Sequence, residues 1–256
     1  MIRHVLAAVD VSETGTEVLR RASAIAQQKA ARLTILNVVE HVDAKLRRDL
    51  TRQISTRDEI LADARSQLEN LVMQHGGDVS SESLRIEAGA PHDCILSIAD
   101  EIRTDLIALG DNRRQSVRDK VLGGTADRVV RGAQMPVLVV KRRFEGQYRT
   151  VVAAIDLEAG SDHVAEAARA ICSDGQVRLV HVVDLPLPFE QAMLRSGWGA
   201  AELSRHRATL KSAAHKRLEA TARRALGPTS ARTEVIVGET APSLVRLSRR
   251  RPATSW

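Results

Sequence analysis

The feature that most constrains this chain is an internal repeat of short apolar runs, each followed by residues at helical spacing. The run Val5–Val9 ends at Asp10, and a closely similar run ends at Asp156. Three pairs of segments match in this way: Val5–Asp10 with Val151–Asp156, Leu33–Glu40 with Val177–Asp184, and Leu84–Gly89 with Thr233–Gly238. A repeat of this kind indicates two copies of one folding unit.

In the first copy, five apolar runs alternate with helical patterns. The runs are Val5–Val9, Leu33–Val39, Ser83–Ala88, Leu106–Leu109 and Val137–Val140. Short, continuous apolar runs are typical of buried parallel strands, and their alternation with helices predicts an α/β fold with helices on both faces of a parallel sheet. A polar stretch from about Asp43 to His75 predicts one long helix that ends at Gly76–Gly77.

The second copy repeats only the first part of this pattern. After Gly238 the sequence offers one more helical pattern and then the tail RLSRRRPATSW. We therefore expect a complete domain over residues 1–143 and a C-terminally truncated one over 149–256, joined by a short polar linker.

Composition narrows the class of protein. Aromatic residues make up 2% of the chain and hydrophobic residues 43%, so the core must be aliphatic. No apolar run reaches the length of about 18 residues that a membrane span needs, so no membrane span is expected. The first acidic residue, Asp10, comes too early in the N-terminal sequence for a secretory signal peptide. Cys94 and Cys172 lie in different copies, as expected for reduced thiols in a cytoplasmic protein. The net charge of +6 is spread over the chain, which does not favour nucleic-acid binding.

The segment from Leu106 to Lys141 carries the most specific signal. A strand ends at Gly110, an Arg-rich loop follows, and Gly123-Gly124-Thr125 comes directly before a helical pattern. A glycine-containing loop at a helix N-terminus presents free backbone N–H groups and a positive dipole end to an anion. The segment therefore predicts a phosphate site.

This segment resembles the phosphate-binding signature of the universal stress protein family, which is Gly, two residues, Gly, nine residues, then Gly and Ser or Thr. Gly110 and Gly123 match the first and third glycines. Arg113 stands where the second glycine belongs, Gly124 stands where the Ser or Thr belongs, and Thr125 follows one place later.

The resemblance implies two Rossmann-like or flavodoxin-like parallel sheets with strand order 3-2-1-4-5, the second incomplete. It also implies that ATP or another adenine nucleotide binds in the first domain, with or without Mg²⁺. By the resemblance, Asp10 lies near the ribose and the adenine, and the Val38 backbone reads the adenine edge. Gly110, Gly123, Gly124 and Thr125 line the phosphates, and Arg113 can pair with them by charge.

Simpler interpretations stay open for several of these residues. Asp10 can be a cap of the following helix, and the glycines can serve ordinary turns. His181, whose counterpart is Asn37, is better explained as a scaffold residue than as a catalytic base. No catalytic motif or metal cluster stands out, so we expect no enzyme, and at most incidental ATP hydrolysis.

Two functions follow as hypotheses. The first is a stress-response regulator that binds an adenine nucleotide, with an affinity reduced by Arg113 and Gly124. The second is a stress-response interaction protein that binds no nucleotide and acts through dimer contacts. In either case, the apolar edge strand Val137–Val140 predicts a homodimer, because fifth strands pair across the two-fold axis in the family that the chain resembles.

Overall fold

The apolar runs form two separate parallel sheets. The computed structural model describes residues 2–40, 57–75, 83–111, 124–228 and 231–249. The described chain divides into two compact units, residues 1–147 (unit 1) and residues 148–256 (unit 2). The domain bounds 1–143 and 149–256 stay predictions.

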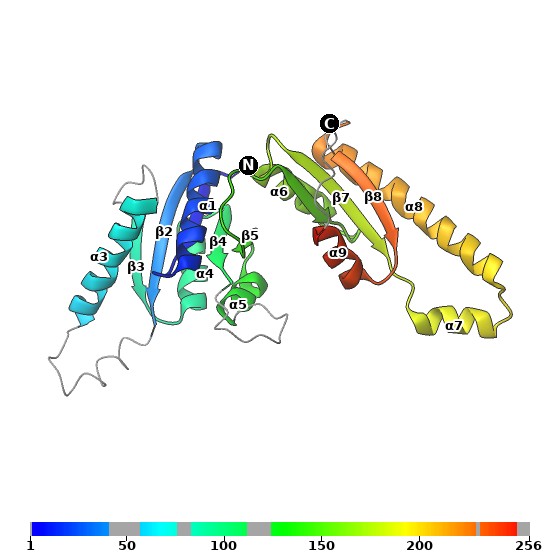
Figure 1. Ribbon diagram of the computed structural model, residues 1–256, viewed down its shortest axis with the longest axis horizontal. Helices are drawn as coiled ribbons and strands as arrows, with labels where there is room; N and C mark the ends of the chain where they lie inside the picture. Colours follow the sequence, from blue (N-terminus) through cyan, green and yellow to red (C-terminus); the bar gives the residue numbers. More distant parts are fainter. Residues whose placement is uncertain (1, 41–56, 76–82, 112–123, 229–230, 250–256) are drawn as a thin grey trace. The chain divides into compact units, whose positions relative to one another are not determined.

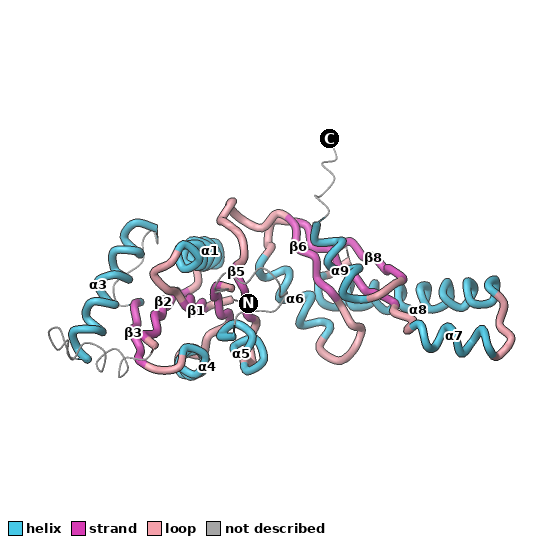
Figure 2. The backbone as a smooth tube through the Cα atoms, turned by 60° about the horizontal axis from the view of Figure 1, so that its bottom comes forward, coloured by secondary structure: helices cyan, strands magenta, loops and turns pink. Residues whose placement is uncertain are grey.

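Unit 1 has the predicted sheet, with strand order β3-β2-β1-β4-β5 and every pairing parallel. Its elements are β1 (His4–Ala8), α1 (Glu13–Lys29), β2 (Arg32–Val39), α3 (Arg57–His75), β3 (Leu84–Ala88), α4 (Pro91–Glu101), β4 (Leu106–Gly110), α5 (Gly124–Gly132) and β5 (Val137–Val140). Helices α1 and α3 cover one face of the sheet, and α4 and α5 cover the other (Figures 1 and 2). The predicted order 3-2-1-4-5 is confirmed.

The core of unit 1 is aliphatic, as the composition predicts. Leu6, Ile107 and Val129 are fully buried in one cluster with residues of α4 and α5. The expected long helix from Asp43 is described only from Arg57, because residues 41–56 lie outside the described residues, as do Gly76 and Gly77.

Unit 2 has a three-stranded parallel sheet, with order β6-β7-β8. Its elements are β6 (Thr150–Ala154), α6 (Ser161–Ile171), β7 (Gln176–Val183), α7 (Leu187–Arg195), α8 (Ala200–Leu226), β8 (Ala231–Val237) and α9 (Thr240–Arg249). Strands β6, β7 and β8 are the counterparts of β1, β2 and β3. Within the described part of unit 2, no strand corresponds to β4 or β5, so this sheet is incomplete, as predicted.

Candidate functional site

A crevice of about 280 Å³ opens where β1, β2 and β4 end. In a parallel α/β sheet, ligands bind beyond the carboxyl ends of the strands, at the point where the strand order reverses. In the order 3-2-1-4-5 this point lies between β1 and β4. Four predicted site residues line the crevice: Asp10, Val38, Gly110 and Thr125.

Asp10 follows β1 and is held at the mouth of the crevice by the start of α1. Ser12 Oγ donates a hydrogen bond to Asp10 Oδ1 at 2.5 Å, and the same Oγ accepts from the backbone N–H of Gly15 at 3.1 Å. Ser12 is therefore the N-cap of α1. The hydrogen bond with Asp10 orients the Ser12 side chain, and it holds the Asp10 carboxylate beside the crevice.

Gly15 is a site residue that carried no recognisable sequence signal. A Cβ atom at Gly15 would lie 1.9 Å from the Asp10 carbonyl oxygen and 2.6 Å from Asp10 Oδ1. The first turn of α1 can approach Asp10 this closely only because position 15 has no side chain. Gly15 lines the crevice, together with Thr14 from the same turn.

Gly110 ends β4 on the opposite side of the crevice. A Cβ there would lie 2.5 Å from Thr14 Cγ2, so this glycine also makes room for α1. Thr125 is half-buried in the first turn of α5 and lines the crevice, whereas Gly124 is exposed, with nothing within 4 Å of a Cβ built on it. Arg113 and Gly123 lie outside the described residues.

Val38 lies near the end of β2, and the residue before it ties β2 to β1. Asn37 is buried, and its Nδ2 donates to the Val9 carbonyl at 2.7 Å. In unit 2 the counterpart His181 makes the same link, because its Nδ1 lies 2.8 Å from the Ile155 carbonyl oxygen. This shared contact supports a scaffold role for His181.

The charge of the described crevice is negative. Asp10 and Glu40 are acidic, and no Lys or Arg is found among its described lining residues. Such a lining suits hydroxyl donors, for example those of a ribose, better than it suits phosphates. Basic residues are instead frequent in the 112–123 sequence, outside the described residues.

The two carboxylates beside the phosphate segment are already paired with cations. Asp111 lies 3.6 Å from Lys141 Nζ, and Asp127 accepts from Arg131 Nε at 2.9 Å. The hydrogen bond and charge of Asp127 raise the pKa of Arg131. Among the described residues, no group of three His, Cys, Asp or Glu side chains is placed to hold a metal ion.

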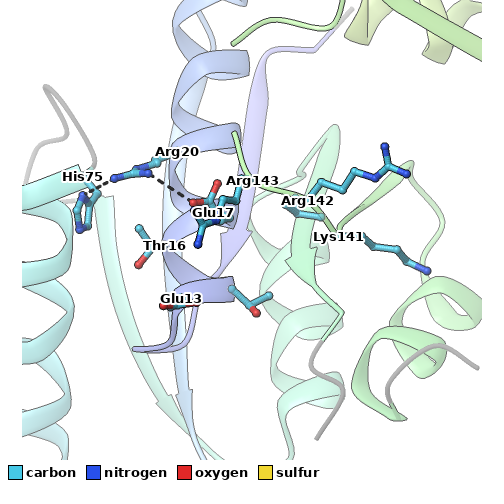
Figure 3. Close-up of a pocket in the computed structure, with 10 residues that line it drawn as sticks. Glu13, Thr16, Glu17, Arg20, His75, Lys141, Arg142 and Arg143 are labelled. Atoms are coloured by element: carbon cyan, nitrogen blue, oxygen red, sulfur yellow. Dashed lines mark hydrogen bonds and ion pairs between the residues drawn. The ribbon is translucent and has the colours of Figure 1, made fainter. Parts of the chain in front are cut away.

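A second, larger hollow of about 460 Å³ lies between α1, the end of α3 and the segment after β5 (Figure 3). Arg20 lies 3.4 Å from Glu17 and 3.2 Å from His75 Nδ1. Figure 3 shows Lys141 and Arg142 extending away from the Arg20–Glu17 pair. Its lining has two acidic side chains, Glu13 and Glu17, and four Lys or Arg side chains, so the hollow is basic on balance.

The surroundings of the aspartate after the first strand differ between the two units. The counterpart of Asp10 is Asp156, which accepts hydrogen bonds from Ser161 Oγ and from the backbone N–H of Glu158, both at 3.0 Å. The backbone bond and then the serine bond lower the pKa of Asp156. Ser161 occupies the position of Gly15 in the repeat. The hydroxyl that binds the carboxylate thus comes from Ser161 in unit 2 and from Ser12 in unit 1.

Three comparisons identify what this chain is similar to. A family model described as the universal stress protein family matches residues 1–141 and again residues 147–255. Universal stress protein A homolog 1 of Coxiella burnetii is 30% identical over 140 residues, which cover 54% of this chain and 95% of that protein. The structure of a putative universal stress protein from Pseudomonas aeruginosa UCBPP-PA14 matches 96% of this chain and 78% of its own, with a TM-score of 0.60 and 14% identity. The structure of a universal stress protein from Archaeoglobus fulgidus matches 96% of this chain and 80% of that protein's chain, with a TM-score of 0.52 and 16% identity.

Proposed function

The chain belongs to the universal stress protein family, and from this premise we propose that it is a stress-response regulator whose unit 1 binds ATP or another adenine nucleotide. The observation that carries the proposal is the crevice, which collects Asp10, Val38, Gly110 and Thr125 at the switch point of the sheet. Nucleotide occupancy would act by shifting the balance between conformations or partners.

The nucleoside end of the ligand fits the described crevice. Its volume of about 280 Å³ is near the lower limit of small-molecule sites, which begin at about 300 Å³. Ribose hydroxyls would donate to Asp10, and the β2 end at Val38 would face the base. The phosphates would extend toward Thr125 and the N-terminus of α5, where a helix dipole favours negative charge.

No catalytic step is proposed. Asp111 and Asp127 are paired with basic side chains, so a role for them in holding Mg²⁺ would require them to exchange partners. Any ATP hydrolysis would be incidental. A cytoplasmic location is part of the proposal and agrees with Cys94 and Cys172, neither of which takes part in a disulfide in the structure. Within the described residues, no helix combines the length and apolar character that crossing a membrane requires.

A second candidate is an interaction protein that binds no nucleotide. The acidic lining of the described crevice favours it, because Asp10 and Glu40 would repel phosphate oxygens. Under this alternative the protein acts through its edge strands. We also propose a homodimer through β5, since β4 occupies one edge of this strand and no described strand occupies the other.

Calorimetric titration with ATP and Mg²⁺ separates the two candidates. We expect at most one site per chain, and we expect Asp10→Ala to abolish binding. The matched control is Asp156→Ala, its counterpart in unit 2, which should leave binding unchanged. Absence of nucleotide binding, together with absence of nucleotide released from the purified protein on denaturation, would favour the interaction protein. Two equivalent sites would contradict both the single-site model and the role assigned to Asp10.

A further inference from the structure

The larger hollow of unit 1 is a second cavity with its own lining. Its volume of about 460 Å³ lies within the range of about 300–1,000 Å³ that is typical of small-molecule sites. Of its described lining residues, only Thr14 also lines the crevice. Four of its lining side chains are Lys or Arg and two are Glu. The hollow is therefore suited to an anion, and it lies apart from the proposed nucleotide site.

The segment that follows β5 carries two of the arginines, and contacts with α1 hold this segment in place. The backbone N–H of Phe144 donates a hydrogen bond to Glu17. Arg21 is only 7% exposed, its Nη1 donates to the Gly146 carbonyl at 2.5 Å, and its guanidinium lies 4.7 Å from the centre of the Phe144 ring. A cation over an aromatic ring adds attraction to the hydrogen bond. The backbone beside the two arginines is therefore fixed before a ligand binds, which lowers the cost of ordering it on binding.

Most of the other charges in the hollow are already matched. Glu17 pairs with Arg20, and Lys141 has the ion pair with Asp111 that is described above. Arg20 also donates to His75 Nδ1, because a guanidinium has no acceptor atom. Glu13 lies in the first turn of α1, where the positive end of the helix dipole favours a carboxylate. These groups therefore leave little unbalanced charge on the side of the hollow that α1 and α3 form.

Arg142 and Arg143 are the exception. Both are exposed, and among the described residues no carboxylate pairs with either of them. Both line the hollow, and Figure 3 shows Arg142 extending away from Glu17. Their guanidinium groups can therefore turn toward an anion without breaking an existing ion pair. A guanidinium presents a planar set of N–H donors that matches the oxygens of a phosphate group.

We propose that this hollow is a second ligand site of unit 1, in which Arg142 and Arg143 bind a diphosphate. Two neighbouring guanidinium groups can each take one phosphate group of a diphosphate, and its negative charge matches the basic balance of the lining. The diphosphate can be the free anion or the end of a larger metabolite, whose remaining part would extend along the hollow toward His75.

Calorimetric titration of the full chain with inorganic pyrophosphate, without Mg²⁺, tests the site. We expect one site per chain. The double change Arg142→Gln with Arg143→Gln should weaken binding by about tenfold or more, because it removes both charged groups of donors. The matched control is Arg205→Gln with Arg223→Gln, which removes two exposed arginines of α8 and changes the net charge equally, and which should leave the affinity unchanged. Circular dichroism checks that each variant is folded.

Two further titrations separate this site from the crevice and identify the source of the diphosphate. Asp10→Ala should bind pyrophosphate as the wild type does, because Asp10 lines the crevice and not the hollow. In that background, uridine diphosphate that binds and is lost with the arginine pair would identify the end of a larger metabolite, whereas binding of pyrophosphate alone would identify the free anion. No binding of pyrophosphate at millimolar concentration, an equal loss in the α8 control, or a loss in Asp10→Ala would overturn the proposal.

Discussion

Thr14 and Gly15, in the first turn of α1, lie directly against the ends of the two central strands. A Cβ at Gly15 would collide with the Asp10 carbonyl, and one at Gly110 would meet the Thr14 methyl group. Neither glycine has a positive φ angle, so both are needed for space and not for backbone freedom. The glycine pattern of the phosphate segment predicts Gly110 as a site residue. No sequence pattern predicts Gly15, because close packing of a helix turn on a strand end leaves no periodic signal.

Gly15→Ala should destabilise unit 1 and displace Asp10. The nearest obstacle to the new methyl group is backbone at 1.9 Å, which cannot rotate away. Overpacking of this kind typically costs about 1–3 kcal/mol of folding free energy. Gly124→Ala is the matched control: its Cβ meets nothing within 4 Å, and it should be neutral or slightly stabilising. Urea denaturation measures both, and a Gly15→Ala chain as stable as wild type would refute the packing argument.

His4 makes the stability of unit 1 depend on pH. It is 6% exposed, with Nδ1 at 3.2 Å from the Ile102 carbonyl and Nε2 at 2.9 Å from Thr34 Oγ1. Burial, followed by the charge of Arg32, lowers the pKa of His4. Below about pH 6.5 the unfolded chain therefore takes up a proton that the folded chain does not, and stability falls as the pH falls.

The measurement is the urea midpoint of unit 1 between about pH 7.5 and about pH 5.5. The wild-type midpoint should fall across this range by more than that of His4→Gln, which lacks the titrating ring. His163→Gln changes an exposed histidine and should behave as wild type. Equal pH profiles for wild type and His4→Gln would show that His4 does not contribute.

At the scale of elements, the apolar runs and their order were predictable because a parallel strand buried on both faces must be continuously apolar. Helices α7 and α8 are not among the predicted elements, although Leu203, Leu210, Ala214 and Leu218 recur at helical spacing along α8. In the site, the sequence identified residues at strand ends. The sequence does not predict that Glu40 and Asp10 line the same crevice, because they follow different strands and come together only when the sheet forms.

The phosphate segment before α5 gives a prediction for the double change Arg113→Gly with Gly124→Ser. The serine has open space, and its hydroxyl would regain a phosphate hydrogen bond of about 1.5–3 kcal/mol. If position 113 requires a positive φ angle, glycine removes a further cost of about 1–2 kcal/mol. ATP affinity should rise about a hundredfold or more in calorimetry. Weaker binding would identify Arg113 as a phosphate ligand, and Gly124→Ser alone separates the two contributions.

For the whole molecule, the repeat predicted two related units, and their difference was predictable only in part. The missing counterparts of β4 and β5 were evident from the sequence pattern. The exposure of Val152 and Val164 was not predictable, because the burial of a side chain depends on which other elements the fold places against it. Among the described residues, β5 lies at an edge of the sheet of unit 1, with β4 as its one neighbour.

The β5 edge gives the last prediction, which concerns the oligomeric state of the full chain. Val137, Leu138 and Val139 are half-buried, so pairing with a second copy would remove more apolar surface from water. Lys141, the charge closest to the strand, is paired with Asp111 and so offers little opposition to a partner strand. We expect the wild-type chain to sediment as a dimer and the change Val139→Lys to halve its mass. Val130→Lys, on α5 and 42% exposed in the wild type, is the control and should keep the dimer. If the wild-type chain is monomeric at high micromolar concentration, with the amides of β5 protected from hydrogen exchange, the β5 dimer does not form and another part of the chain covers that edge.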